Sequence, residues 1–251
     1  MTAPPTNPAF HIHGIDRASR WLITCDHATN HVPDWINGGD LGLPPEDMGR
    51  HIAYDPGALG VARALADLMG APMISSDFSR LVIDPNRGEA DPTLLMKLYD
   101  GTIIPANRHA DRTEKARRLE RLHRPYHAAL ETLAARREDT VICAIHSFTP
   151  QLRGRPPRPW QVGILSDPRD RRLAEPLIAA LHAQHIPTGD NEPYKGHLAG
   201  DSIDRHALQS GRLNTLIELR QDLIVTEEQQ KGWAARLAPL LTQALDSLQN
   251  P

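Results

Sequence analysis

The stretch Trp21-Leu-Ile-Thr-Cys-Asp-His-Ala-Thr-Asn-His-Val-Pro33 decides the fold that we expect for this chain. Its first five residues form a short apolar run, which is typical of a buried strand. The run then changes abruptly to polar residues that include Asp26 and His27, and Pro33 ends any extended pairing. Open α/β sheets place their chemistry at the carboxyl ends of buried strands, so this stretch predicts such a site.

A second stretch far downstream repeats the pattern. The apolar run Val141-Ile-Cys-Ala-Ile145 is followed directly by His146. Each histidine taken alone is explained by a hydrogen bond that caps its strand. Two buried strands that each deliver a histidine to the same edge of a sheet favour a metal site instead.

The rest of the chain alternates between strand-like and helix-like patterns. Candidate strands cover residues 72–75, 161–165 and 214–219, and residues 185–187 should lead into another short strand. Candidate helices cover residues 57–69, 112–137, 168–185 and the segment after Thr226. Pro125 should kink or divide the second helix. The alternation predicts an α/β fold, a three-layer sandwich around a mixed, mostly parallel central sheet. We expect one domain over residues 1–251, with a loosely held arm (1–20) and an active-site loop (150–160).

Composition excludes several classes of function. The net charge is −3 and aromatic residues make up 4%, which argues against a nucleic-acid partner. No apolar run approaches the roughly 20 residues of a membrane span, and the N-terminus lacks the architecture of a signal peptide. The two cysteines, Cys25 and Cys143, lie in predicted buried strands as small apolar groups. We therefore expect a cytoplasmic protein that contacts neither nucleic acid nor membrane; the oligomeric state stays open.

His27 and His146 are the leading zinc ligands in this sequence. A catalytic zinc ion takes three protein ligands, and anionic oxygen suits it better than a neutral amide such as that of Asn30. Asp26 and Asp55 are both anionic, and we favour Asp55 because it should lie near the same edge of the sheet. Asp55-Pro56 also has the pattern of a helix start, with the aspartate as N-cap.

The segment Arg80-Leu-Val-Ile-Asp-Pro-Asn-Arg87 carries two guanidinium groups and an amide around a turn. Arginine binds carboxylates in a bidentate manner and stabilises oxyanions, so the pair suits a small acidic substrate. The alternative is a salt-bridged turn in which Asp84 pairs with one arginine.

Glu218 lies within the apolar run Ile217-Glu-Leu219. An apolar strand tolerates a glutamate poorly unless the carboxylate has a partner or a function. Arg220 is an improbable partner from within the strand, although we count it among the predicted substrate-binding residues. Beside a metal-bound water, a partly buried glutamate has the basicity that a general base needs. We therefore interpret Glu218 as a catalytic residue.

Ten other histidines are expected mostly on the surfaces of helices and loops. They are His13, His31, His51, His109, His123, His127, His182, His185, His197 and His206. Of these, His197 and His206 lie near Tyr194 and Asp204, and this group is a candidate lining of a pocket. The sequence has no nucleophile elbow, no P-loop and no dinucleotide-binding glycine pattern.

Four blocks of this sequence together resemble the N-formylglutamate amidohydrolase family, over roughly residues 20 to 225. They are Asp26-His-Ala-Thr-Asn30, His51-Ile-Ala-Tyr-Asp-Pro-Gly-Ala58, Ser79-Arg-Leu-Val-Ile-Asp-Pro-Asn-Arg87 and Ile217-Glu-Leu-Arg-Gln-Asp-Leu223. That family belongs to the zinc carboxypeptidase-like fold group, which includes aspartoacylase. Those relatives use His-x-x-Glu for the first two ligands, whereas this chain has His27-x-x-Asn30, so the third ligand stays open.

The resemblance implies a zinc ion, held by His27 and His146, that activates water for attack on an amide carbon. It also implies that Arg80 steadies the oxyanion and that Asn86 and Arg87 bind the substrate carboxylate. Glu218 would take the proton of the water and pass it to the leaving amine.

We therefore predict hydrolysis of a small N-acyl acidic amino acid, with N-formyl-L-glutamate as the leading substrate and histidine degradation as the expected pathway. Two alternatives remain: a deacylase or carboxypeptidase with another preference, and a metal-free protein that binds carboxylates without turnover.

Overall fold

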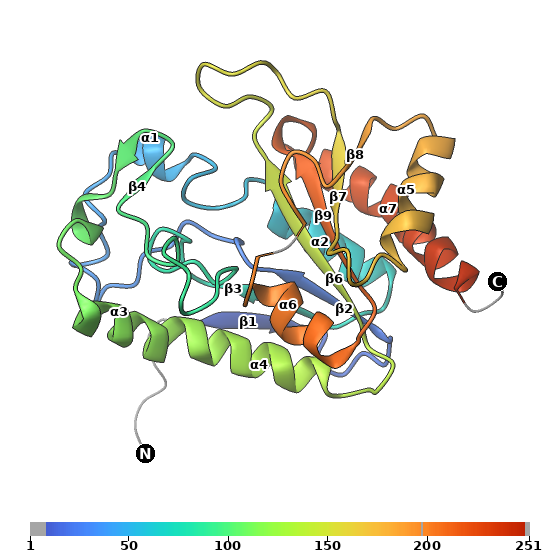
Figure 1. The fold of residues 1–251 in the computed structure, drawn as a ribbon, viewed down its shortest axis with the longest axis horizontal. Helices are drawn as coiled ribbons and strands as arrows, with labels where there is room; N and C mark the ends of the chain where they lie inside the picture. Colours follow the sequence, from blue (N-terminus) through green and yellow to red (C-terminus); the bar gives the residue numbers. More distant parts are fainter. Residues whose placement is uncertain (1–8, 197, 249–251) are drawn as a thin grey trace.

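The apolar runs form a seven-stranded sheet in the computed structural model, which describes residues 9–196 and 198–248 (Figure 1). The strand order is β1-β3-β2-β6-β9-β7-β8, and a separate two-stranded sheet pairs β4 with β5. Pairing is parallel except between β1 and β3 and between β7 and β9 in the main sheet. The strands are β1 (Phe10–His13), β2 (Trp21–Cys25), β3 (Met73–Ser76), β4 (Leu98–Tyr99), β5 (Thr102–Ile103), β6 (Val141–Phe148), β7 (Val162–Leu165), β8 (Thr188–Asp190) and β9 (Asn214–Arg220).

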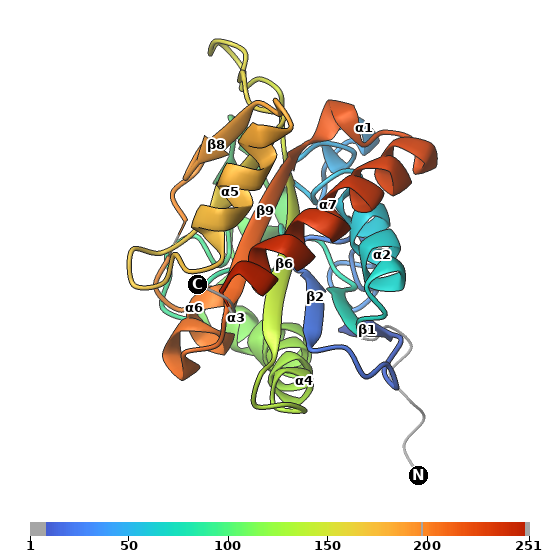
Figure 2. The same ribbon diagram turned by 90° about the vertical axis from the view of Figure 1, so that its right-hand side faces the viewer.

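Helices cover both faces of the main sheet, so the predicted α/β sandwich is confirmed (Figure 2). The α-helices are α1 (Pro45–Met48), α2 (Ala58–Leu68), α3 (Arg112–Arg118), α4 (Arg124–Ala134), α5 (Ala174–Ala183), α6 (Ser202–His206) and α7 (Glu227–Ser247). One apolar core joins the sheet to α2, α5 and α7. The other joins it to α4, α6 and the long loops between residues 32 and 104.

The central strands are buried on both faces, which explains their continuous apolar character. Successive side chains of a strand point to opposite faces. In β2, Trp21 and Ile23 belong to the core under α2 and α7, whereas Leu22 belongs to the core under α4. Both cysteines are buried in the first core and form no disulfide, as expected.

The order of the strands creates a crevice between β2 and β6. From β2 the chain continues to β3 on one side, whereas from β6 it continues to β7, which lies on the other side beyond β9. Ligands of open α/β sheets bind at such a switch point, outside the carboxyl ends of the strands. His27 follows β2 and His146 lies near the end of β6, so both histidines reach this crevice.

The long helix predicted over residues 112–137 is divided. α3 passes into a π-helical turn, Leu119–His123, and α4 starts at Arg124 with Pro125 in its first turn. The proline therefore divides the helix where we expected, because its missing N–H is tolerated at a helix start.

One local prediction is wrong. The expected arm contains β1, which pairs with β3 because the edge of the sheet offers free backbone groups there. The pairing of β4 with β5 had no counterpart among the expected strands. The short strand expected to follow residues 185–187 is confirmed as β8, which begins at Thr188 after His185, whose left-handed backbone ends the helical segment.

The final helix follows its sequence signals closely. Thr226 accepts a hydrogen bond from the Gln229 N–H, and the Gln229 side chain bonds back to the Thr226 N–H, which completes a capping box. Among the described residues, no helix is both long and apolar enough to cross a membrane.

Candidate metal centre and active-site cavity

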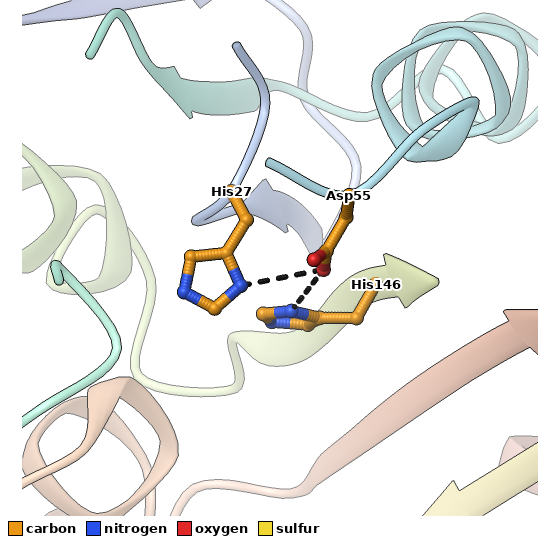
Figure 3. A group of neighbouring side chains, drawn as sticks. All are labelled: His27, Asp55 and His146. Atoms are coloured by element: carbon orange, nitrogen blue, oxygen red, sulfur yellow. Dashed lines mark hydrogen bonds and ion pairs between the residues drawn. The ribbon is translucent and has the colours of Figure 1, made fainter. Parts of the chain in front are cut away.

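His27, Asp55 and His146 converge in the crevice between β2 and β6 (Figure 3). Asp55 Oδ2 lies 3.3 Å from His27 Nδ1 and 2.9 Å from His146 Nδ1. One ligand atom from each residue lies within 4.8 Å of the others, and all three side chains are buried. Within residues 9–196 and 198–248, this is the group of histidine, cysteine and acidic side chains that can hold a metal ion.

Local backbone contacts bring Asp55 to the histidines. The Asp55 N–H donates to the His27 carbonyl (2.9 Å), and the Ser147 N–H donates to Asp55 Oδ2 (3.2 Å). The alternative role of Asp55 as a helix N-cap is wrong. The N-cap of α2 is Gly57, whose left-handed backbone lets the chain turn into the helix after Asp55.

Each imidazole is held from behind by a second carboxylate. Asp84 Oδ1 lies 2.7 Å from His27 Nε2, and Asp26 Oδ2 lies 3.3 Å from His146 Nε2. Asp26 is itself fixed by Tyr126, whose hydroxyl donates to Asp26 Oδ1 (2.5 Å). Metal-binding histidines commonly have such a carboxylate on the nitrogen that faces away from the ion.

Charge in the crevice is balanced by close contacts. Burial alone would lower the pKa of His146, but the carboxylates of Asp26 and Asp55 outweigh it and raise this pKa well above the ordinary value. Burial likewise opposes ionisation of Asp26, yet its contact with His146 lowers the pKa of Asp26 to about 2. The centre therefore keeps its carboxylates ionised and ready to balance positive charge.

The donor set fits a divalent metal ion. Two imidazoles offer Nδ1 toward the Asp55 carboxylate while their Nε2 atoms face carboxylates. Imidazole nitrogen and carboxylate oxygen are ligand types of zinc, and three protein ligands are the number that a catalytic zinc site uses.

Glu218 lies beside this centre because of strand register. β6 and β9 are parallel neighbours in which His146 is paired with Glu218. Residues of equal parity share a face, so both side chains point to the side of Ala144 and Leu216. Burial raises the pKa of Glu218 to about 7, and its Oε2 atom has no hydrogen-bond partner among the described residues.

A cavity of about 400 Å³ opens in front of the centre. Its lining includes the three candidate ligands and Glu218, together with His51, Arg80, Asn86, Arg87, Tyr99, Ser147, Leu165, Pro193, Tyr194, Lys195, Gly196, Leu198, Asp201 and Leu216. The volume is in the range of small-molecule sites.

Arg80 joins the cavity to the metal centre. Its guanidinium donates to Asp84 Oδ2 (2.9 Å) and lies 3.5 Å from Asp55 Oδ1. Burial would lower the pKa of Arg80, but Asp84 and its neighbours outweigh it and raise that pKa. The salt bridge that the sequence offered as an alternative therefore exists, and it holds Arg80 in the wall of the cavity.

Asn86 and Arg87 present unused donors to the cavity. The side-chain oxygen of Asn86, Oδ1, accepts a hydrogen bond from the Ser202 N–H (3.1 Å), which leaves the side-chain NH₂ group of Asn86 available. Within the described part of the chain, the Arg87 guanidinium donates to Thr93 Oγ1 and to the Asn86 carbonyl, and no carboxylate pairs with it.

Arg220 lies outside the lining of the cavity. Its guanidinium pairs with Asp222 (2.8 Å) and donates to the carbonyls of Arg158 and Trp160. Arg220 shares a face of β9 with Glu218, two residues before it, but these contacts engage its guanidinium outside the lining of the cavity. Asn30 is also elsewhere, because its amide donates to the Met48 carbonyl (2.9 Å).

Several residues of the site had no signal in the sequence. Lys195 and Asp201 line the cavity from loops and Tyr99 lines it from the two-residue strand β4, segments in which no periodic pattern indicates direction. His51, expected at the surface, lines it as well. Tyr194 lines the cavity as anticipated.

The prediction of surface positions is wrong for three other histidines. His123, His127 and His206 are buried behind the residues that line the cavity. His197 lies outside the described residues.

The fold and the site define an α/β protein with a candidate metal centre, in which two imidazoles and one carboxylate lie beside a buried glutamate. The model of the N-formylglutamate amidohydrolase family matches residues 19–225, and the chain belongs to this family. It is thus a hydrolase of the group that acts on linear amide bonds.

Solved structures share the fold of this chain. The gene product Atu2144 from Agrobacterium tumefaciens is 34% identical, with a TM-score of 0.91 and 97% of each chain covered. N-formylglutamate amidohydrolase from Ralstonia eutropha JMP134 is 23% identical, with a TM-score of 0.65, over 96% of this chain and 97% of the other. The second likeness concerns the fold alone. No curated protein matches the chain.

Proposed function

We propose that this chain hydrolyses the amide bond of a small N-acyl acidic amino acid, with N-formyl-L-glutamate as the first candidate. The observation that carries the proposal is the register of β6 and β9, which puts the buried carboxylate of Glu218 beside the centre formed by His27, Asp55 and His146. A general base must lie next to the water that it deprotonates. Glu218 lies beside the candidate metal centre, where such a water would bind, in a cavity of substrate size.

The proposed cofactor is one zinc ion, held by His27 Nδ1, His146 Nδ1 and the Asp55 carboxylate. An ion in this position supplies Lewis-acid chemistry, in that it acidifies water and polarises a carbonyl. Asp84 and Asp26 orient the two imidazoles toward it.

Glu218 acts as the general base in this proposal. Burial raises its pKa to about 7, so the carboxylate takes a proton from water and later returns it to the leaving amine. Oε2 lacks a hydrogen-bond partner among the described residues, which leaves this atom available for the water.

Arg80 stabilises the negative charge that develops on the carbonyl oxygen during attack. Its guanidinium is buried in the cavity wall and stays protonated because Asp84 and Asp55 lie beside it. A fixed cation in a water-poor site lowers the barrier without reorganisation at the moment of reaction.

Asn86 and Arg87 bind the carboxylate of the substrate. Both are adjacent in one turn, and each offers N–H donors to the cavity. Lys195 adds another cation to the lining, which favours a substrate with two carboxylates. We leave Arg220 out of the proposed substrate contacts, because its guanidinium is engaged with Asp222 and backbone carbonyls.

The segment 150–160 is proposed as an active-site loop of a single-domain enzyme. Arg158 in this segment donates to the Tyr194 hydroxyl (3.1 Å) and lies over its ring, and Tyr194 lines the cavity. A cytoplasmic location and a role in histidine degradation stay predictions.

A screen with metal analysis tests the proposal. The purified chain should contain about one equivalent of divalent metal and hydrolyse N-formyl-L-glutamate faster than the N-acetyl and N-succinyl compounds. Chelation should abolish turnover, and added zinc should restore it. Turnover of another acyl compound alone would favour the related deacylase. A chain that binds L-glutamate, holds no metal and shows no hydrolysis with added zinc would be the carboxylate-binding protein.

A further inference from the structure

Three buried histidines lie behind the turn formed by Pro85, Asn86 and Arg87, named here the 85–87 turn. His123, His127 and His206 are each at most 1% exposed. The rings of His123 and His127 are 4.4 Å apart, and those of His127 and His206 are stacked at 5.1 Å. None of the three lines the cavity, so the reaction proposed above does not use them directly.

Two of these imidazoles contact the backbone of the turn. His123 Nε2 lies 2.9 Å from the Arg87 carbonyl oxygen, and His127 Nε2 lies 2.9 Å from the Pro85 carbonyl oxygen. A carbonyl oxygen only accepts, so both Nε2 atoms must carry a proton and donate. The residue between them is held from α6, where the Ser202 N–H donates to Asn86 Oδ1.

The outer side of His127 leads to the surface through a chain of hydrogen bonds. His127 Nδ1 lies 2.8 Å from His206 Nε2, and His206 Nδ1 lies 2.8 Å from Glu131 Oε2. We call His127, His206 and Glu131 the histidine relay. Its side chains come from α4 and α6, and it ends at the half-exposed carboxylate of Glu131.

A count of protons constrains the tautomers in the relay. Three contacts join the Pro85 carbonyl, His127, His206 and Glu131, and each needs one proton. Two neutral imidazoles supply only two, because both ends of the chain are acceptors. A third proton therefore makes one ring an imidazolium, and we assign it to His206 because its Nδ1 faces the Glu131 carboxylate. In either arrangement His127 Nε2–H donates to the Pro85 carbonyl.

Loss of the third proton leaves the inner contacts intact. Burial lowers the pKa of His206 against the pull of the Glu131 carboxylate, and Arg205 lowers it further while Asp26 opposes. When the proton leaves, the outer contact can open, because Arg212 lies 3.6 Å from Glu131 and offers it another partner. His206 then still donates from Nε2, and His127 still donates to Pro85.

His123 faces a similar set of charges but has no relay. Burial lowers its pKa, Arg205 lowers it further, and Glu89 and Asp84 oppose. Its Nδ1 atom is buried without a partner among the described residues, so the neutral ring with Nε2–H satisfies the contact to Arg87.

The π-helical turn Leu119–His123 provides the geometry. A π-turn inserts an extra residue into a helix, and such turns frequently occur at functional sites. Here it ends at His123, and α4 then carries His127 one turn later. Their Nε2 atoms therefore reach carbonyls two residues apart in the same turn.

We propose that His123 and His127 are positioning residues for the Asn86–Arg87 carboxylate site, with the histidine relay fixing the tautomer of His127. This role rests on the proposed function, because that function makes the 85–87 turn the seat of the substrate carboxylate. The imidazoles touch only the backbone of the turn, so they set where the Arg87 guanidinium lies and leave the reacting atoms alone.

Substitutions that keep or remove one donor test the proposal. Gln places its amide nitrogen near the position of Nε2, so His127→Gln retains a donor to Pro85, whereas His127→Leu removes it. His127→Leu should raise KM, and the Kd for L-glutamate measured by calorimetry, about tenfold while kcat changes less than about twofold. His127→Gln should stay within about threefold of the parent. His182→Gln, at an exposed position on α5, is the matched control.

Unchanged KM and Kd in His127→Leu would overturn the positioning role. Equal losses in His127→Gln and His127→Leu would do the same, because they would point to packing instead of donation. Should His127→Leu fail to fold, imidazole ¹⁵N spectra of the parent protein decide. They should show His127 protonated at Nε2 at neutral pH, and a proton on Nδ1 instead would refute the proposal.

Backbone NMR spectra distinguish a failure of this proposal from a failure of the proposed function. A chain that neither binds L-glutamate nor hydrolyses any N-acyl amino acid refutes the function. The positioning of the turn is then judged by the backbone amide signals of Asn86 and Arg87. These should shift in His127→Leu and stay in place in His127→Gln; signals unmoved in both variants would overturn it.

Discussion

Two clusters of buried histidines lie within this chain, and their partners differ. His27 and His146 contact carboxylates on both sides, those of Asp55, Asp84 and Asp26. The cluster of His123, His127 and His206 faces backbone carbonyls and one half-exposed carboxylate. Burial is the same in both clusters.

The partners decide the charge that each cluster tolerates. Burial alone lowers the pKa of any histidine, because it penalises the imidazolium. In the first cluster the carboxylates reverse this effect, and the pKa of His146 rises well above its usual range. In the second cluster burial prevails, and the pKa of His127 falls well below it. The first cluster is therefore built to hold positive charge, whereas His123 and His127 of the second donate hydrogen bonds while neutral.

The largest effect should come from Glu218, the acid beside the first cluster. Glu218→Gln should keep metal binding and reduce kcat on the order of 100-fold or more, because the amide cannot accept the proton of water. Steady-state kinetics with metal analysis measure this. Glu138→Gln, at an exposed turn, is the control. Near-normal kcat in Glu218→Gln would refute the assignment of the base.

Asp26→Asn replaces the charged partner of His146 by a neutral one and so makes the first cluster resemble the second. Metal affinity should fall roughly 10- to 100-fold, because the imidazole loses the carboxylate that orients it. Competition with a chromophoric chelator measures the change. Tyr126→Phe, which leaves the Asp26 carboxylate in place, should lose less. Equal affinities in the parent and Asp26→Asn would mean that the charge behind His146 is irrelevant.

Arg87→Ala removes the guanidinium of the turn that the second cluster supports. Hydrogen bonds to charged groups contribute about 1.5–3 kcal/mol, so KM should rise about 10- to 100-fold with a smaller change in kcat. Arg112→Ala, at an exposed residue of α3, should leave KM unchanged. If KM for the N-acyl substrate does not move in Arg87→Ala, the carboxylate binds elsewhere.

The pH dependence of the unfolding free energy should show that the pKa of His123, in the second cluster, is lowered by folding. Burial lowers the pKa of His123 below the ordinary 6.5, so the unfolded chain binds this proton more readily. The stability is present above pH 6.5 and is lost as the pH falls toward the folded pKa. His123→Gln cannot take up the proton, so its unfolding free energy should decline less steeply, by at most about 1.4 kcal/mol per pH unit.

Urea unfolding at about pH 7.5 and pH 5.5 measures this difference. The exposed His182→Gln variant should follow the parent. Parallel curves for the parent and His123→Gln would mean that His123 titrates as a free histidine does.

Apolar periodicity predicted most of the fold. The runs before His27 and His146 and around Glu218 are strands β2, β6 and β9, because burial on both faces leaves a continuous apolar signal. The elements that it missed, β1 and the pair β4–β5, are short and lie at edges or in loops. Such strands bury too little surface to need a pattern.

Sequence reasoning likewise located some residues of the candidate site and missed others. Residues at the ends of strands, such as His27, His146 and Glu218, were located by sequence reasoning, since an abrupt change from apolar to polar marks a strand end. The burial of His123 and His127 escaped it, because each lies in a helix among charged neighbours and its partner is a backbone carbonyl. A backbone carbonyl is present in every residue, so the residue type does not indicate that it will be the partner of a histidine.

The sequence by itself determined the strands, the residues that they deliver to one edge and the family to which the chain belongs, since these depend on local pattern. The tertiary structure decided that Asp55 completes the centre, that Asp84 and Asp26 hold its imidazoles, and that Arg220 turns away. Those outcomes depend on which loops meet across the sheet. A contact between distant segments is fixed by packing and strand register, and the order of residues along one segment does not specify either.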